Sequence, residues 1–231
     1  MNALLITGTD TDAGKTVLTC AIAAYWQKYC SNRPLGMMKP IQSGTGDREL
    51  YQRLFDLNQS QEEITPLYFQ APLAPPIAAE REGRSIEVQK LWPVFTTLRQ
   101  RSALVLVEAL GGLGSPITDE LTVADLGRDW QIPAVLVVPV RLGAISAAVA
   151  HVALARQVGV PLCGIVLNCV QPRSPQQIDD WTPIAAIESF TQTPVLGILP
   201  HLADSTDLDA LAKAASDLDL ERLMPFKNIP Y

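Results

Sequence analysis

The first glycine-rich segment of the chain has the residue types and spacing of a phosphate-binding loop. It follows the apolar run Ala3–Ile6 and reads Gly8-Thr9-Asp10-Thr11-Asp12-Ala13-Gly14-Lys15-Thr16. A glycine-rich turn between a buried strand and a helix directs backbone N–H groups at an anion, and the helix dipole adds positive potential. Lys15 would supply a mobile cation and Thr16 a ligand for Mg²⁺. The segment predicts a protein that binds a nucleoside triphosphate, the alternative being a coincidental Gly-Lys-Thr at a strand–helix junction.

Two acidic residues make this loop unusual. Gly8 and Gly14 enclose one residue more than the usual pattern, and the segment between them contains Asp10 and Asp12. Two carboxylates beside a polyanion are unfavourable unless they face a cation, either Mg²⁺ or an amine of a second substrate. The alternative is that one of them caps the following helix.

Charged residues also end two apolar runs further along the chain. Lys39 follows the run that begins at Leu35, and Glu108 ends the run Ala103–Glu108. Lys15 and Lys39 around one site suit a reaction that accumulates negative charge, such as phosphoryl transfer. We expect Thr16, Glu108 and, as a third ligand, Asp47 to hold Mg²⁺. The alternatives are a Lys39 that extends to solvent and a Glu108 at a solvated strand end.

Two more apolar runs lead into polar residues with a chemical use. A second helix start near Gly143 to Ser146 has no phosphate-binding lysine, so it suits a carboxylate, although Ser146 could simply cap the helix. Asn168 ends a strand with a carboxamide that matches the N6 and N7 edge of adenine. The alternative is that Asn168 fixes the following loop.

The elements expected to position these residues are strands and helices in alternation. Strands are predicted over Ala3–Thr7, Leu35–Lys39, Ala103–Glu108, Ala134–Val140, Leu162–Asn168 and Val195–Leu199. Helices are predicted over Lys15–Tyr29, Ala144–Gln157 and Leu208–Ala215. Continuous apolar strands indicate a parallel sheet covered on both faces. We therefore expect an α/β fold with a single doubly wound, mostly parallel sheet and helices on both faces, as in P-loop NTPases.

Residues 47–84, rich in Pro and Gln, are the least regular part of the chain. The prolines Pro72, Pro75 and Pro76 predict a long excursion there. A surface loop is the favoured interpretation, and a lid or a wall of the substrate site is the alternative.

Composition limits the function further. With 231 residues and 48% hydrophobic content, the chain can bury one large core, so we expect a single domain over residues 1–231. The net charge of −6 disfavours nucleic acid as a partner. No apolar run reaches membrane-spanning length and no secretory leader is recognisable. The four cysteines, which lack metal-ligand spacing, favour a reducing compartment, so the expected location is the cytoplasm; they are Cys20, Cys30, Cys163 and Cys169.

The motifs together resemble dethiobiotin synthetases, from the first strand to Pro200. The resemblance is carried by Gly8 to Thr16, Lys39-Pro40 with Ser43-Gly44, Glu82-Gly83-Arg84, Glu108 with Gly111-Gly112, Leu142-Gly143 and Leu196-Gly197 with Pro200. It implies that 7,8-diaminopelargonate captures CO₂ as a carbamate, that ATP phosphorylates the carbamate with Mg²⁺, and that the second amine closes the cyclic urea. The products are dethiobiotin, ADP and phosphate.

The resemblance also implies roles for individual residues. Lys39, Lys15, Thr11 and Asp12 would be catalytic, and Ser43, Gly143 and Ser146 would bind substrate. The nucleotide would contact Asp12, Ala13, Gly14, Lys15, Thr16, Val17, Asn168 and Pro200. The family works as a homodimer, so the helix start near Gly143 would receive the substrate's distal carboxylate from the other subunit.

The chain differs from the family pattern at three places. Ala109-Leu110 follows Glu108 where Gly-Ala is usual, Ser146-Ala147 replaces Asn-His, and Asp12 replaces Glu. Two other functions are compatible with a phosphate-loop fold. A regulatory partition-type or septum-placement ATPase would have a lysine early in the loop, where this chain has Asp10. An amidoligase acting on a corrin-type acid would need a glutamine-hydrolysing domain with a reactive cysteine.

Overall fold

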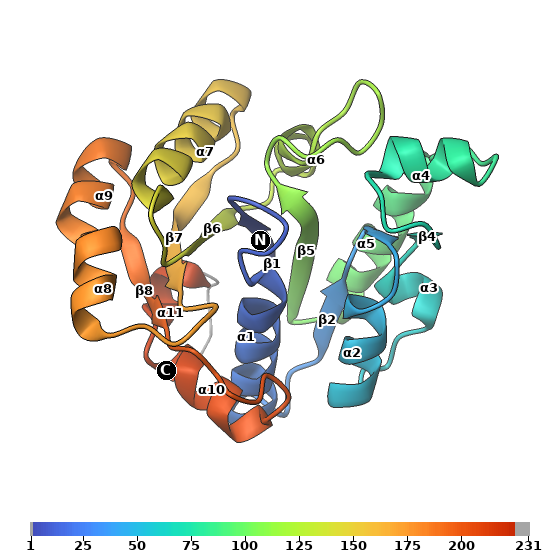
Figure 1. The fold of residues 1–231 in the computed structure, drawn as a ribbon. Helices are drawn as coiled ribbons and strands as arrows, with labels where there is room; N and C mark the ends of the chain where they lie inside the picture. The colour runs from blue at the N-terminus through green and yellow to red at the C-terminus, as the bar shows by residue number, and fades with distance from the viewer. Residues whose placement is uncertain (1, 225–231) are drawn as a thin grey trace.

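A computed structural model describes residues 2–224, and the two ends of the expected domain, residue 1 and residues 225–231, lie outside the described part. At its centre is a six-stranded sheet (Figure 1). Its strands are β1 (Ala3–Gly8), β2 (Leu35–Met38), β5 (Leu104–Gly112), β6 (Ala134–Pro139), β7 (Leu162–Asn168) and β8 (Val195–Leu199). They lie in the order β2-β5-β1-β6-β7-β8, and every pairing is parallel. The predicted doubly wound sheet is confirmed.

Helices cover both faces of this sheet, which explains why its strands are apolar throughout. On one face α1 (Lys15–Tyr29) and α10 (Leu208–Ser216) pack on alternate residues of β1 such as Leu4 and Ile6. On the other face α5 (Leu91–Arg101), α6 (Val123–Trp130) and α7 (Ala144–Val158) belong to the cores that contain the remaining strand residues. Figure 1 shows α6 and α7 above the strands and α1 and α10 below them. Because side chains alternate along a strand, burial on both faces requires an unbroken apolar run.

The remaining helices are short. They are α2 (Asp47–Leu54), α3 (Gln61–Ile64), α4 (Pro75–Arg81), α8 (Pro175–Trp181), α9 (Ile184–Thr191) and α11 (Leu220–Leu223), with a 3₁₀ turn over Val88–Lys90. Among the described residues no helix is long and apolar enough to cross a membrane.

The prediction of an irregular excursion over residues 47–84 was wrong. The region contains α2, α3 and α4, and a parallel pair of three-residue strands, β3 (Ile41–Ser43) and β4 (Leu67–Phe69), lies beside them. Pro75 and Pro76 start α4 instead of extending a loop, because proline has no N–H to lose in the first turn of a helix. The segment is therefore an ordered wall beside the sheet.

The predicted strand ends need two corrections near the charged residues. β2 ends at Met38, so Lys39 lies just beyond it. Glu108 is not at a strand end, because β5 continues to Gly112. The register of β5 against β1 shifts immediately afterwards, with Ile6 opposite Glu108 but Gly8 opposite Gly112. Such a bulge bends a strand and interrupts its pairing, here next to the phosphate loop.

Candidate active site

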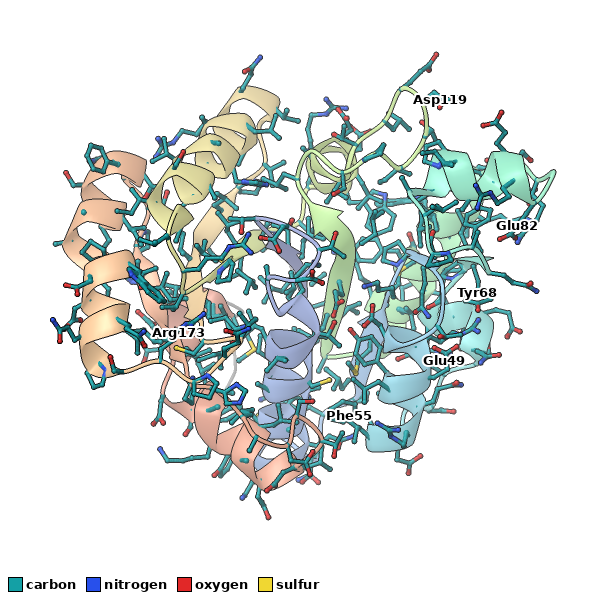
Figure 2. All side chains as sticks on the ribbon, in the orientation of Figure 1. Glu49, Phe55, Tyr68, Glu82, Asp119 and Arg173 are labelled. Carbon is teal, nitrogen blue, oxygen red and sulfur yellow. The ribbon has the colours of Figure 1, made fainter. Side chains whose placement is uncertain are left out.

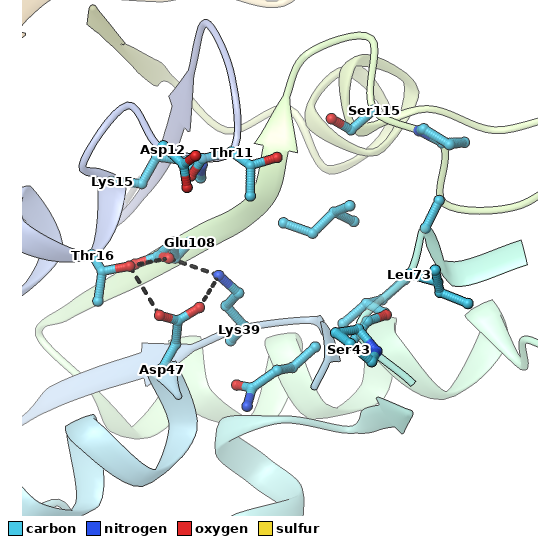
Figure 3. Close-up of a pocket in the computed structure, with 16 residues that line it drawn as sticks. Thr11, Asp12, Lys15, Thr16, Lys39, Ser43, Asp47, Leu73, Glu108 and Ser115 are labelled. Carbon is cyan, nitrogen blue, oxygen red and sulfur yellow. Dashed lines mark hydrogen bonds and ion pairs between the residues drawn. The ribbon is translucent and has the colours of Figure 1, made fainter. Parts of the chain in front are cut away.

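The candidate active site is a cavity of about 580 Å³ at the carboxyl ends of β1, β2 and β5 (Figure 3). Ligands of open parallel sheets bind at this edge, and the volume is in the range of small-molecule sites. Eight of the predicted site residues line it: Thr11, Asp12, Lys15, Thr16, Lys39, Ser43, Asp47 and Glu108. The other seven predicted site residues do not line it: Ala13, Gly14, Val17, Gly143, Ser146, Asn168 and Pro200.

The phosphate loop leads into α1 in a conformation that suits an anion. Gly14 caps α1 with a φ of 88°, no side chain caps the helix, and its first turn contains no acidic residue. The Lys15 ammonium donates to the carbonyl oxygens of Asp10 and Thr11, at 2.9 and 3.0 Å. Burial lowers the pKa of Lys15, the charge of Glu108 opposes this, and the Lys39 ammonium adds to the lowering. The N–H groups of the α1 start are thus available to phosphate oxygens.

Two carboxylates and one ammonium meet beside Thr16. The Lys39 ammonium lies 2.5 Å from Asp47 and 2.7 Å from Glu108. The Thr16 hydroxyl lies 3.0 Å from an oxygen of each carboxylate. Lys39 is only 5% exposed, so it does not extend to solvent. Burial by itself would lower the pKa of Lys39, but the charges of Glu108 and Asp47 and its hydrogen bonds to them outweigh burial and raise it.

Glu108 is completely buried, yet both of its oxygens are satisfied. Oε1 accepts hydrogen bonds from Thr16 and Lys39. Oε2 accepts from the hydroxyls of Thr19, at 2.8 Å, and Tyr51. Burial and the negative charge of Glu108 raise the pKa of Tyr51 well above its ordinary value, so its hydroxyl keeps its proton and donates. These donors offset the cost of burying the polar oxygens of Glu108.

These groups fit Mg²⁺. The ion prefers oxygen ligands and is commonly held by one or two carboxylates together with substrate phosphates. Asp47, Glu108 and the Thr16 hydroxyl supply three such oxygens at the mouth of the phosphate loop. Within residues 2–224, no three Asp, Glu, His or Cys side chains form a metal group by themselves.

The acids of the loop do not cap α1, whose cap is Gly14. Asp10 accepts from the backbone N–H of Asp12 at 2.8 Å, and its other oxygen lies 2.6 Å from the guanidinium of Arg141, just after β6. The cation that Asp10 faces is therefore the Arg141 side chain, and not Mg²⁺ or a substrate amine as the sequence predicted. Asp12 is exposed and lines the cavity.

A short network holds the loop that carries Asp47. The Gln42 carboxamide accepts from the N–H of Arg48 and donates to the carbonyl of Gly44 and to Glu49. Glu49 also accepts from the N–H of Gly46 at 2.9 Å. Burial by itself would raise the pKa of Glu49, but hydrogen bonds from backbone amides, Arg48 and Gln42 lower it to about 2. The carboxylate of Asp47 is positioned by this network at the start of α2.

The outer wall of the cavity comes from the segment between β4 and α4. Pro72, Leu73 and Ala74 line it, so the interpretation of this segment as a surface loop was wrong and that of a wall fits the geometry. Glu82 accepts the N–H groups of the two residues before Pro72, and Arg84 donates to the carbonyl of Tyr68, which fixes the wall. Figure 2 shows Glu49 on α2, Tyr68 on β4 and Glu82 after α4 on the right-hand side of the molecule.

Ser43 and Leu110 face the cavity from two other elements. The Ser43 hydroxyl is buried and has no partner in the described part of the chain, so it can bond a ligand. Leu110, in β5, narrows the cavity by comparison with the smaller residue usual in the family that the sequence resembles.

Asn168 lies on the other side of the phosphate loop. Its amide N–H donates to the carbonyl of Ala13 at 2.9 Å, and its buried Oδ1 has no hydrogen-bond partner among residues 2–224. Asn168 therefore ties down the phosphate loop, and not the loop that follows β7 as in the alternative to adenine binding. Pro200 is exposed and directly follows β8, the strand next to β7. Both are at the same edge of the sheet as Gly14, where a base extending from the bound phosphates would lie.

The second helix start is exposed and separate from the cavity. Gly143 caps α7 with a φ of 86° and no side-chain cap, so the interpretation of Ser146 as the cap was wrong. Ser146 is exposed in the first turn, and Leu142 beside it is 76% exposed. The free N–H groups of this start would favour a negatively charged group.

Sequence reasoning missed Thr19, Tyr51, Gln42, Ser115 and the cavity-lining Ile41 and Pro116. One signal existed for two of them. Thr19 follows Thr16 by three residues on one helix, and Tyr51 follows Asp47 by four, spacings that place both pairs on one face. The cysteines are all free; Cys163 is only partly buried, whereas the other three are buried.

The fold and the loop together define a phosphate-loop nucleotide-binding protein. The family model described as "AAA domain" matches residues 2–208. Among solved structures, the cell division ATPase MinD of Pyrococcus furiosus superposes with a TM-score of 0.57 at 15% identity, covering 96% of this chain and all of that one. At this identity the likeness concerns the fold alone.

Curated relatives show which family of phosphate-loop proteins the chain belongs to. The ATP-dependent dethiobiotin synthetase BioD of Gloeothece citriformis is 57% identical over 225 residues, which cover 97% of this chain and 100% of the relative. That of Crocosphaera subtropica is 53% identical, covering 96% and 100%. The chain belongs to the dethiobiotin synthetase family.

Proposed function

We propose that the protein is an ATP-dependent ligase that joins CO₂ to 7,8-diaminopelargonate and closes the cyclic urea of dethiobiotin, with release of ADP and phosphate. The observation that carries the proposal is the convergence of the phosphate loop with Lys39, Asp47 and Glu108 on one cavity, in a chain of this family. Full-length relatives favour this activity over a regulatory partition-type ATPase, with which the chain shares the fold.

The nucleotide is held by the loop and its neighbours. Residues 12–17 would contact the phosphates through their N–H groups and the Lys15 ammonium, which exchanges its carbonyl partners for phosphate oxygens. Asn168 and Pro200 would flank the adenine. Thr16, Asp47 and Glu108 would hold Mg²⁺, which would supply positive charge to the triphosphate.

The second substrate occupies the outer half of the cavity. One amine of the diamine adds to CO₂ and loses a proton, which gives a carbamate. Thr11 and Ser43 would donate hydrogen bonds to the carbamate or diamine, and Asp12 would face an ammonium group. The carbamate oxygen then attacks the γ-phosphorus and ADP leaves, which forms a carbamic-phosphoric anhydride.

Lys39 acts where the two anions meet. A carbamate oxygen and a γ-phosphate repel each other, and an ammonium between them reduces that repulsion as the new P–O bond forms. The second amine then attacks the carbonyl carbon of the anhydride, phosphate leaves with the bonding electrons, and the amine loses its proton. Holding all groups in one cavity makes both steps effectively intramolecular.

We further propose a cytoplasmic homodimer with no nucleic-acid or membrane partner. In it, the start of α7 receives the distal carboxylate of the substrate bound by the other subunit. The exposed Leu142 and the uncapped N–H groups after Gly143 support this.

The test is to follow ADP release with purified protein, Mg²⁺, bicarbonate and diaminopelargonate, and to omit each component in turn. We expect ADP only when all are present, with dethiobiotin formed in equal amount. ADP formation at the same rate without the diamine would contradict the ligase and favour the regulatory ATPase.

A further inference from the structure

Tyr51 is a buried polar residue that the reaction above does not use. It lies on α2, is completely buried, and its ring packs in the core beneath α1. Its hydroxyl points at one acceptor, Oε2 of Glu108. A ring that merely filled the core would need no hydroxyl, so the contact with Glu108 requires its own explanation.

The two oxygens of Glu108 have different surroundings. Oε1 faces the cavity, where it meets Thr16 at 3.0 Å and Lys39 at 2.7 Å. Oε2 faces the protein interior and meets Tyr51 and Thr19. Hydrogen bonds to Oε2 therefore decide which oxygen is presented to the cavity and at what angle.

Tyr51 is the dedicated donor to Oε2. The hydroxyl of Thr19 lies 2.8 Å from Oε2 but also 2.9 Å from the carbonyl oxygen of Lys15, and it has one hydrogen to give. The phenol has no such second acceptor in the described part of the chain. When Thr19 donates to the carbonyl of Lys15, Tyr51 is the remaining donor to Oε2 among the described residues.

The place of Tyr51 on α2 links it to the other carboxylate. Asp47 begins α2, and Tyr51 follows four residues later, on the same face of the helix. One helix thus contains the Asp47 ligand and the residue that orients Glu108 on β5. The distance between the Asp47 and Glu108 carboxylates therefore depends on how α2 packs against β5.

We propose that Tyr51 is a positioning residue for the metal: its hydroxyl fixes the Glu108 carboxylate so that Oε1 is presented to Mg²⁺ together with Asp47 and Thr16. The inference rests on the proposed metal site. Residues that hydrogen-bond a metal ligand typically change metal affinity by about 10- to 100-fold when removed.

The test compares Tyr51→Phe with Tyr29→Phe, in the full-length protein without the diamine. Both substitutions remove one hydroxyl, but Tyr29 is 56% exposed at the far end of α1. Binding of a fluorescent ATP analogue is titrated against Mg²⁺, and separately in EDTA. We expect Tyr51→Phe to raise the half-saturating Mg²⁺ concentration by about 10-fold or more, with unchanged affinity in EDTA. Tyr29→Phe should match the parent.

Three results would overturn the inference. An unchanged Mg²⁺ requirement in Tyr51→Phe would show that the hydroxyl does not position Glu108. An equal loss of affinity with and without Mg²⁺ would indicate a merely structural role. Both leave the ligase intact, whereas a parent protein whose nucleotide binding ignores Mg²⁺ would remove the metal site itself. Should Tyr51→Phe fail to fold, Thr19→Val leaves the phenol as the remaining donor to Oε2. The Mg²⁺ requirement of Thr19→Val should then stay close to that of the parent, and a rise of about 10-fold would show that Thr19, and not Tyr51, positions Glu108.

Discussion

Replacement of Lys39 by methionine separates two consequences of one charge. Methionine has similar length and no ammonium, so Lys39→Met leaves Asp47 and Glu108 facing each other with the Thr16 hydroxyl between them. The charge is expected to matter for the folded state and, independently, for the transition state of phosphoryl transfer.

The effect on stability follows from burial. Glu108 is fully buried, whereas the Asp47 side chain is 29% exposed and can rely partly on water. Loss of one partner from a buried ion pair typically costs 3–5 kcal/mol, and the donors from Thr19 and Tyr51 remain, so we expect a loss of about 3 kcal/mol. Replacing both partners, in Lys39→Met with Glu108→Gln, should recover part of this loss, because no unpaired charge stays buried.

The effect on turnover should be larger than the effect on binding. Removal of one charge-stabilising donor typically lowers kcat about 10²- to 10³-fold. Lys15, the proposed phosphate contact, remains in this variant. The affinity for ATP should therefore change by no more than about threefold if Lys39 acts only in the transition state. Single-turnover ADP release gives the rate, and equilibrium titration gives the affinity. Equal losses in rate and in affinity would refute the role assigned to Lys39.

The dependence of this stability difference on pH provides a second check. The pKa of Lys39 is raised in the folded protein, so its contribution is complete below the unfolded pKa and is lost only as the pH rises through the folded pKa. The difference in free energy of unfolding between parent and Lys39→Met should therefore stay constant from about pH 6 to about pH 9. A difference that falls within that range would contradict the ion pair.

Two further predictions concern stability alone. For Glu49→Gln, the loss in free energy of unfolding should be greatest above the ordinary pKa of 4.5 and shrink as the pH falls towards about 2, because the folded pKa is depressed. The Glu49 side chain is 41% exposed, so solvent screening keeps the loss in free energy of unfolding below about 1 kcal/mol. Urea unfolding of parent and Glu49→Gln from pH 3 upward measures this loss. A difference that does not change with pH would contradict the hydrogen bonds assigned to Glu49. Gly14→Ala and Gly143→Ala both force a positive φ on alanine, but an added Cβ at Gly14 would lie 1.8 Å from Asn168 Nδ2, whereas that at Gly143 meets open space. We expect the free energy of unfolding, measured by thermal unfolding, to fall by about 1 kcal/mol in Gly143→Ala and by at least about 2 kcal/mol in Gly14→Ala. Equal losses would contradict the packing of Asn168 against the phosphate loop.

The sequence predicted the sheet because its strands are buried on both faces, which leaves long apolar runs. The three-residue strands β3 and β4 are too short for such a pattern, and Pro75-Pro76 was interpreted as a loop although proline also starts helices. The prediction placed Lys39 and Glu108 correctly in one site, although Glu108 lies within β5 and not at its end. The shift in register after Glu108 depends on pairing with β1, which no local pattern encodes.

The contacts of the site were less predictable than its members. Single side chains could be assigned to phosphate, metal or substrate by type, but their partners come from elements far apart in sequence. Tyr51 reaches Glu108 across 57 positions, and Arg141 reaches Asp10 across 131. Such pairs depend on how α2 and β6 are seated against the central strands, which is a property of the whole packing.

The charges of the cavity explain why metal and nucleotide should bind together. The formal charges of Lys15, Lys39, Asp47 and Glu108 sum to zero, and Arg141 compensates Asp10. Extra positive potential for a triphosphate must therefore come from the N–H groups at the start of α1 and from Mg²⁺. With Asp12 exposed at the same rim, a nucleotide without metal would meet one uncompensated carboxylate. The orientation of Glu108 by Tyr51 thus bears on nucleotide affinity as well as on metal affinity, which is why the two are measured in one titration.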